Sequence, residues 1–541
     1  MTESKKPTRS IASIAGIVAA ATLISKVFGL VRQMSLAAAF GNGIAMEAFT
    51  YAYAIPGFLL ILLGGINGPF HSAIVSVLTK EQDKSQTAPI VETITTIVGI
   101  VLLCVSMLIF CFASNAIDTI APNLTHSSDA IRGALVRQCA IEQLQIMSAM
   151  AVLAGFIGIG FGTLSSADFY WLPSISPLLS SATTIIGIGV LAIYLGQKIM
   201  LPEYALLGGK VLAGTTLIGA VLQWLMQVIT QWRVGLGTIK PRFEWRRQGV
   251  QDVLKILGPA TFSSGTLQIN LFIDLSFASG IVGAASAMQY SGLLIQTPLG
   301  IISNIILVSL LPEFSRLADP HNWNQLKDRI RQGLILTGIA MMPLSAVLMA
   351  LAFPIVKTVY QYGAFKTQDA QLVGSILIAS SLGMFFFLGR DVLVRVFYAL
   401  GDGSTPFKIA VVNIFFNFLF DFLFWKPFGA AGITLSTVCI NIISFSVMLF
   451  LLDRRLNGLP WRRFRPLLGI FIASVVTGGV TWGISYGWQQ FVPVSNTFTL
   501  LIQLAAAAGI GFGVFVALVS QLKLPEFDKF IGQIRQKLLK K

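Results

Sequence analysis

The sequence predicts an all-α polytopic membrane protein with about fourteen transmembrane helices, on the basis of its composition and its long uncharged stretches. Of the 541 residues, 55% are hydrophobic and 11% are charged, whereas a soluble domain carries about 25% charged residues. Many uncharged stretches exceed the roughly 18 residues that indicate a spanning helix. They include residues 93–117, 143–167, 169–197, 211–232 and 332–356, and the longer stretches 275–312 and 466–522 have room for two spans each.

The expected spans follow from these hydrophobic segments in chain order. They lie at residues 11–40, 50–78, 90–115, 137–164, 172–197, 205–231, 253–279, 288–315, 332–360, 371–400, 407–425, 429–452, 466–489 and 497–521. Lysine and arginine are concentrated in alternate connections, such as 233–247 and 316–331, and basic connections face the cytoplasm. Both termini are therefore expected in the cytoplasm, and the net charge of +15 is a topology signal. The basic segment 238–251, which carries Trp245, is expected at the cytoplasmic headgroups.

A short internal repeat predicts two lobes. Residues 45–56 resemble residues 287–298, because both open with Ala-Met followed by Glu47 or Gln289 and both reach a proline nine residues later. The copies lie six spans apart, so they share one orientation and are related by a parallel pseudo-two-fold axis along the membrane normal. We expect two six-helix lobes, with a cavity between them, followed by two extra C-terminal helices and a basic tail. The expected boundaries are residues 1–235, 236–455 and 456–541.

Signatures of several other functions are absent from the sequence. It contains no nucleophile elbow, Walker loop or His-Glu-x-x-His sequence, and its three histidines show no metal-ligand spacing. The chain is therefore expected to be neither an enzyme nor an ATP-driven pump. Nucleic-acid binding is not expected either, because the basic residues follow the membrane topology and form no folded basic surface.

The most specific segment is residues 390–408, Arg-Asp-Val-Leu-Val-Arg-Val-Phe-Tyr-Ala-Leu-Gly-Asp-Gly-Ser-Thr-Pro-Phe-Lys. It resembles the Phe-Tyr-Ala-x-x-Asp-x-x-Thr-Pro-x-Lys signature of the MurJ/MviN family, lipid II flippases of the MOP exporter superfamily. Residues 23–32, 258–279 and 361–365 resemble other parts of that family. The resemblance implies a bacterial cytoplasmic (inner) membrane protein that moves lipid II, the undecaprenyl-diphosphate-linked peptidoglycan precursor, to the outer leaflet by alternating access. The implied partners are this precursor and membrane lipids, with cell-wall synthesis proteins as further candidates.

Two departures from the family pattern leave the cargo open. Family members usually carry an arginine near the start of the second helix, and residues 55–70 have none. The eighth helix usually carries an Asp-Arg pair, and Gly292 and Leu293 stand in its place. The alternatives are a flippase for another polyprenyl-diphosphate-linked oligosaccharide, a cation-coupled multidrug exporter of the same superfamily, and a non-transporting scaffold.

Five charged residues in or beside predicted spans are candidates for contact with the cargo: Lys26, Arg32, Glu47, Arg390 and Arg395. A cation in the middle of the membrane costs roughly 2.5–3.5 kcal/mol, and a diphosphate would attract the two cations of the first span. The alternative for this pair is snorkelling to the headgroups. Glu47 is either a cavity residue or an outer cap. The last two arginines cluster with Asp391, and a local ion-pair network is their alternative role.

Polar residues of the second lobe predict a cation site. Asn417 and Asp421 are four residues apart and share a helix face, as do Ile433 and Thr437. Together with Asp274 they offer only oxygen ligands, counting the Ile433 carbonyl, and hard cations prefer such a set. The set resembles the sodium site of the family, so a sodium ion is its expected occupant and no cofactor is required. The alternatives are hydrogen bonds between helices and coupling to protons.

Overall fold

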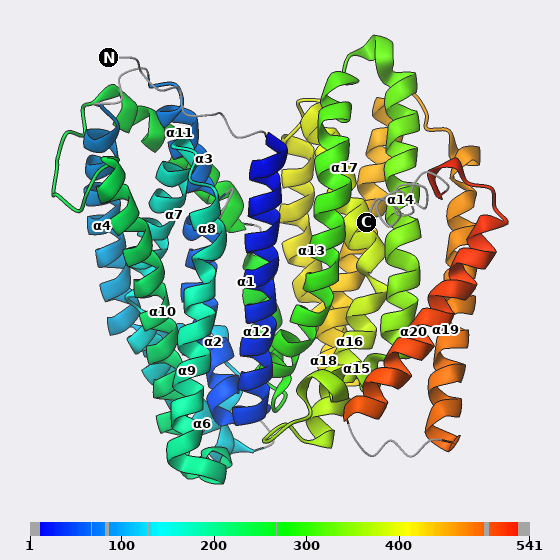
Figure 1. Cartoon of the computed structure of the whole chain (residues 1–541), viewed down its shortest axis with the longest axis horizontal. Helices are drawn as coiled ribbons and strands as arrows, with labels where there is room; N and C mark the ends of the chain where they lie inside the picture. Colours follow the sequence, from blue (N-terminus) through cyan, green and yellow to red (C-terminus); the bar gives the residue numbers. More distant parts are fainter. Residues whose placement is uncertain are drawn as a thin grey trace. The chain divides into compact units, whose positions relative to one another are not determined.

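The computed structural model of the chain describes residues 11–65, 68–81, 86–126, 129–266, 268–491 and 497–527. These residues form helices and short connections, with no β-strand among them (Figure 1). Ten helices within the described ranges are long and apolar enough to cross a membrane, or up to twelve if each of two bent pairs is one span. The prediction of an all-α polytopic membrane protein is thus confirmed, whereas the count of fourteen spans stays a prediction.

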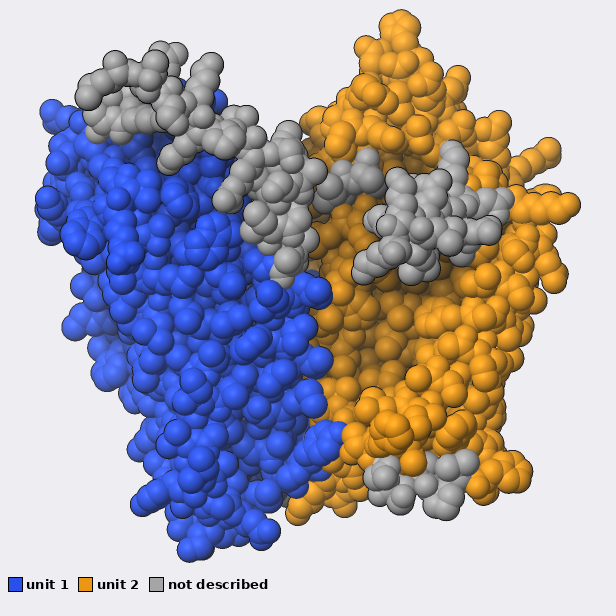
Figure 2. Space-filling view, viewed as in Figure 1, with its two compact units in different colours: residues 1–286, 362–365 blue, residues 287–361, 366–541 orange. Residues whose placement is uncertain are grey.

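The chain divides into two compact units, drawn in separate colours in Figure 2. Unit 1 comprises residues 1–286 and 362–365, and unit 2 comprises residues 287–361 and 366–541. These units are defined by packing, whereas the lobes expected from the sequence were defined by the repeat. The lobe boundaries at residues 235 and 455 stay a prediction.

Unit 1 is built from twelve α-helices and short 3₁₀ turns within its described part. The helices are α1 (Ile11–Phe40), α2 (Ile44–Gly64), α3 (Pro69–Leu78), α4 (Thr87–Cys111), α5 (Ala113–Ile120), α6 (Ala130–Met147), α7 (Met150–Ser166), α8 (Trp171–Ile175), α9 (Pro177–Leu195), α10 (Ala205–Val234), α11 (Gln248–Thr266) and α12 (Ile269–Ala278). The turns are η2 (Leu124–His126), η3 (Gly196–Met200) and η4 (Pro202–Tyr204).

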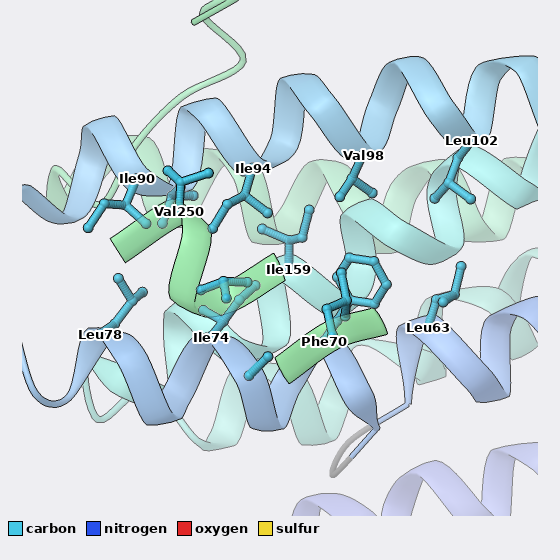
Figure 3. Packing of buried hydrophobic residues seen from close by; sticks show 14 of the residues in the cluster. Leu63, Phe70, Ile74, Leu78, Ile90, Ile94, Val98, Leu102, Ile159 and Val250 are labelled. Atoms are coloured by element: carbon cyan, nitrogen blue, oxygen red, sulfur yellow. The ribbon is translucent and has the colours of Figure 1, made fainter. Parts of the chain in front are cut away.

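An apolar cluster joins α2, α3, α4, α7 and α11 of unit 1. Figure 3 shows the side chains of α4 pointing toward those of α3, with Ile159 of α7 and Val250 of α11 between them. Glycine permits the closest approach: a Cβ on Gly158 of α7 would overlap the carbonyl oxygen of Leu63 on α2. Small residues let membrane helices approach in this way, and here they bring α7 against the end of α2.

Unit 2 is built from eight α-helices in its described part, and α13 begins three residues before the boundary between the units. They are α13 (Ala284–Arg316), α14 (Trp323–Ala350), α15 (Ala352–Tyr360), α16 (Thr367–Leu382), α17 (Met384–Ala399), α18 (Ser404–Arg455), α19 (Pro466–Phe491) and α20 (Thr497–Ser520). The 3₁₀ turns η5 (Pro320–Asn322) and η6 (Trp461–Phe464) lie between them. α14 packs against α17 and α19, and α19 packs against α20.

α18 consists of two helical halves that meet at Gly429, whose φ of 58° is non-helical. Glycine adopts this left-handed region without steric cost. The amide of Asn413 in the first half donates to the hydroxyl of Ser444 in the second half at 2.7 Å. The prediction that residues 407–425 and 429–452 form antiparallel neighbouring helices is confirmed by this contact.

The two copies of the predicted repeat both open a helix. Glu47 lies in the first turn of α2, and Gln289 lies near the start of α13. Each helix also contains the predicted proline, Pro56 in α2 and Pro298 in α13. The two copies therefore have the same local structure, as a repeat requires.

Candidate functional site

α1 carries two of the predicted cargo-binding cations, Lys26 and Arg32. Both side chains are half-buried, and neither forms an ion pair with another residue of the described ranges. The Nε atom of Arg32 is buried and has no hydrogen-bond partner in the described part of the chain. A buried donor of this kind costs free energy until it is hydrogen-bonded, so Arg32 retains the capacity to bind an anionic group.

The two cations lie on different sides of α1. Six residues separate Lys26 from Arg32, which in an α-helix is about 9 Å along the axis and about 120° around it. They do not form one pocket by themselves. A ligand that contacts both must extend over more than one helical turn, as a diphosphate with an attached sugar does.

Glu47 occupies the first turn of α2 and is buried, with 1% of its surface exposed. Its Oε2 atom forms an ion pair with Nη1 of Arg132 on α6 at 2.6 Å. Its Oε1 atom accepts a hydrogen bond from the backbone N–H of Gly283 at 3.1 Å. The carboxylate thus joins α2, α6 and the connection between α12 and α13, and its predicted contact with the cargo stays a prediction.

Arg132, the ion-pair partner of Glu47, is not among the residues predicted from the sequence. Its Nη2 atom also donates to the carbonyl of Asn42 at 2.9 Å, and the Asn42 side chain accepts from the hydroxyl of Ser286 at 3.0 Å. The only signal in the sequence is an arginine just before the fourth predicted span. Because its partners are remote in the sequence, no local pattern pairs it with Glu47.

The family signature segment has a structural role at the start of α18. The carboxylate of Asp402 accepts hydrogen bonds from the Ser404 hydroxyl at 2.9 Å and from the Thr405 backbone N–H and hydroxyl at 3.0 and 2.7 Å. It also pairs with Arg455 at the far end of α18. Burial raises the pKa of Asp402, but the hydrogen bonds from Thr405 and Ser404 and the charge of Arg455 lower it more, to about 2.

Arg390, Asp391 and Arg395 lie on α17, as predicted, but no ion pair joins them in the described structure. Asp391 and Arg395 are exposed. Arg390 instead donates from Nη1 to Oδ1 of Asn441 on α18 at 3.0 Å. The Asn441 amide in turn donates to the Thr437 carbonyl at 2.7 Å.

Four of the five predicted cation ligands lie together on α18 in unit 2. Asp421 is fully buried, and its Oδ2 atom accepts a hydrogen bond from the Asn417 amide at 3.0 Å. The carbonyl of Asn417 accepts from the hydroxyl of Ser436, between Ile433 and Thr437 on the other half of the helix. The ligand atoms that the four predicted residues offer to a cation are all oxygens, which fits a hard cation such as sodium.

The fifth predicted ligand, Asp274, lies half-buried on α12 in unit 1. Its participation with the four residues of α18 stays a prediction. Within the described ranges, no group of three or more His, Cys, Asp or Glu side chains is arranged to hold a metal ion. A site here must therefore rely on amide, hydroxyl and carbonyl oxygens beside its acids.

The sequence matches one family over most of its length. The model of the family described as lipid II flippase MurJ matches residues 36–502. A probable lipid II flippase MurJ from Synechocystis sp. is 51% identical over 529 residues, which cover 98% of this chain and 98% of that protein. The lipid II flippase MurJ of Burkholderia cenocepacia is 28% identical over 94% of this chain and 96% of that protein.

Solved structures share the fold. A lipid II flippase MurJ in an inward closed conformation matches with a TM-score of 0.73 and 23% identity, over 93% of this chain and 98% of that one. An inward-facing multidrug resistance MATE family transporter of the MOP superfamily matches with a TM-score of 0.60 and 15% identity, over 82% and 98%. At these identities the structural likeness concerns the fold alone.

Proposed function

We propose a transport function from one premise: the chain belongs to the lipid II flippase family MurJ. It moves lipid II from the inner to the outer leaflet of the bacterial cytoplasmic membrane by alternating access. The observation that carries this proposal is the 51% identity to a probable lipid II flippase over nearly the full length of both chains. A flippase transfers its cargo unchanged, so the function requires no covalent step.

Lys26 and Arg32 bind the diphosphate-sugar head group of the cargo. Cations hydrogen-bond phosphate oxygens strongly, and Arg32 does so through a planar fork of donors. The buried Nε of Arg32, which has no partner in the described part of the chain, supports this role. Arg390 and Arg395 of α17 are further candidates for contact with the cargo, and Glu47 is a candidate that is already held by Arg132.

A sodium ion would supply the coupling charge. Asn417, Asp421, Thr437 and the carbonyl of Ile433 would hold it through oxygen atoms only, with Asp274 as the fifth predicted ligand. Asn417 keeps the Asp421 carboxylate in place through its amide. Asn441 links Thr437 to Arg390, so this network connects the cation ligands with a candidate cargo residue.

The chain lies in the inner membrane with both termini in the cytoplasm. The basic connections favour this orientation. Its direct partners are the lipid-linked precursor and membrane lipids, and cell-wall synthesis proteins are candidate partners for delivering or receiving the cargo.

Depletion complementation tests the function. A bacterium whose own lipid II flippase is shut off receives this chain, and growth together with lipid II exposed on the outer leaflet is measured. The wild-type chain restores both. Lys26→Ala and Arg32→Ala impair both at unchanged protein abundance, and Lys26→Arg is milder because it keeps the charge.

Three results would redirect the proposal. Failure of the abundant wild-type chain to expose lipid II points to another polyprenyl-diphosphate-linked oligosaccharide, to a drug, or to a scaffold role without transport. Full growth of both alanine variants removes Lys26 and Arg32 from the cargo site. Unimpaired transport without sodium, but not without a pH gradient, replaces sodium by protons.

A further inference from the structure

The connection between α10 and α11 folds back along α4. In Figure 1 it is the green loop at the outer edge of the helices beside α4. The chain leaves α10 at Gly235, whose φ of 75° gives a left-handed cap. Gly237, with φ of 116°, then lies so close to α4 that a Cβ would press on the Ala88 carbonyl and the Val91 side chain.

The inner side of this connection is fixed to α4 by a buried acid. Oε1 of Glu92 accepts hydrogen bonds from the Thr238 backbone N–H at 3.1 Å and from the Thr238 hydroxyl at 2.8 Å. Its Oε2 atom pairs with Arg242 at 3.4 Å, and the Arg242 backbone N–H donates to the Thr96 hydroxyl at 3.1 Å. A carboxylate on a membrane helix is costly unless it is paired, so the connection both shields Glu92 and is held by it.

The outer side of the connection carries large apolar residues. Ile239 is 54% exposed, Phe243 64% and Trp245 57%. The described residues therefore leave more than half of each side chain exposed. Aromatic residues with apolar neighbours are typical of the membrane–water interface.

Two cations without a carboxylate partner are sequence neighbours of these apolar residues. Arg242 is balanced by Glu92 and Glu244. Lys240 and Arg246, in contrast, form no ion pair within the described ranges, and the Arg246 guanidinium stacks on the Trp245 ring at 5.0 Å. Apolar side chains alternate with unpaired cations, which is the pattern of a segment that enters the headgroup region of an anionic leaflet.

We propose that residues 238–247 form a binding surface for anionic phospholipids. Ile239, Phe243 and Trp245 insert at the boundary between headgroups and acyl chains, and Lys240 and Arg246 contact lipid phosphates. Glu92 fixes the depth of the segment because it holds the segment's inner side on α4. The surface is independent of the transported cargo and requires only that α4 and α10 lie in a bilayer.

Quenching by brominated lipids tests this surface on the full-length protein. The chain is reconstituted in phosphatidylcholine vesicles that contain equal fractions of either brominated phosphatidylglycerol or brominated phosphatidylcholine. The fluorescence of a Trp245→Phe variant is subtracted from that of the wild type to isolate the signal of Trp245. The local enrichment of an anionic lipid is expected to be about fivefold for each cation near the surface, so brominated phosphatidylglycerol quenches Trp245 more strongly.

In the double variant Lys240→Gln/Arg246→Gln, the two brominated lipids should quench Trp245 equally. In Lys240→Arg/Arg246→Lys, the stronger quenching by brominated phosphatidylglycerol should remain. Arg462→Gln/Arg465→Gln removes the same charge from another basic connection and should also keep it. Raising the salt concentration should reduce the excess by screening. Equal quenching of wild-type Trp245 by the two lipids, or no quenching by either, overturns the proposal whether or not the chain transports lipid II.

Discussion

The ion pair between Glu47 and Arg132 is expected to be a main stabilising contact of unit 1. Glu47 has 2% of its side chain exposed and Arg132 has 19%, and the pair is 2.6 Å long. Removing one partner of a buried pair costs about 3–5 kcal/mol, because the other charge remains buried alone. Arg132→Met leaves the more deeply buried charge, so we expect a loss of about 3 kcal/mol or more in the free energy of unfolding.

The double variant Glu47→Gln/Arg132→Met leaves no charge buried and should cost less than the sum of the two single variants. The expected coupling is about 2 kcal/mol, within the range for residues in direct contact. The free energies are measured by reversible unfolding in mixed detergent micelles. Asp118 and Arg137 provide the control, because their pair is more exposed, at 50% and 33%, and exposed pairs contribute about 1 kcal/mol or less.

Two outcomes would refute this reasoning. If Arg132→Met costs no more than Arg137→Met, the carboxylate of Glu47 is stabilised by something other than the arginine. If the two single costs add without coupling, the residues do not act as a pair. In either case the ion pair would not hold the connection between α12 and α13 to α2.

Three further predictions concern the cation, acid stability and topology. Sodium at ten times its dissociation constant should stabilise the purified protein by about 1.4 kcal/mol, which is measured as a raised melting temperature at constant ionic strength. Asp421→Asn should abolish this stabilisation, and Lys26→Ala should keep it. A melting temperature that depends on pH but not on sodium would indicate coupling to protons. The pKa of Asp402 is lowered to about 2, so its contribution to stability is complete above about pH 4 and is lost as the pH falls toward 2. In the Asp402→Asn variant, the melting temperature should therefore fall less between about pH 4 and pH 2 than it does in the wild type. An equal fall in both proteins would show that the Asp402 carboxylate at the start of α18 does not contribute to acid stability. Cysteines placed at positions 494 and 536, both outside the described residues, should react with a reagent added from the periplasm at 494 only; the reverse pattern would invert the topology.

The helices were predictable because a spanning segment must be long and apolar. Each of the predicted spans overlaps a helix or a helix pair of the structure. The breaks within spans were less accessible. The bends of 44° between α6 and α7 and of 43° between α16 and α17 fall inside apolar stretches that read as continuous spans. The close approach of Gly158 to Leu63 is visible only once α7 lies against α2.

A direct hydrogen bond joins two of the predicted site residues that are near in sequence. Asn417 and Asp421 contact each other, as four-residue spacing on a helix requires. Arg390, which the sequence groups with Asp391, also donates a hydrogen bond to Asn441. That contact depends on how α17 packs against α18, and no sequence pattern encodes such packing directly.

The charges inside the spans fall into two classes, and the difference identifies the strongest functional candidates. A charge in a spanning helix needs a compensating partner because its desolvation is costly. Glu47 and Glu92 find that partner within unit 1, in Arg132 and Arg242, so folding alone explains why they are tolerated. Lys26 and Arg32 have no ion pair among the described residues, and part of the Arg32 guanidinium is buried without a hydrogen bond there. Contacts among the described residues do not explain these two cations, which is why the proposed function assigns them to the phosphates of the cargo.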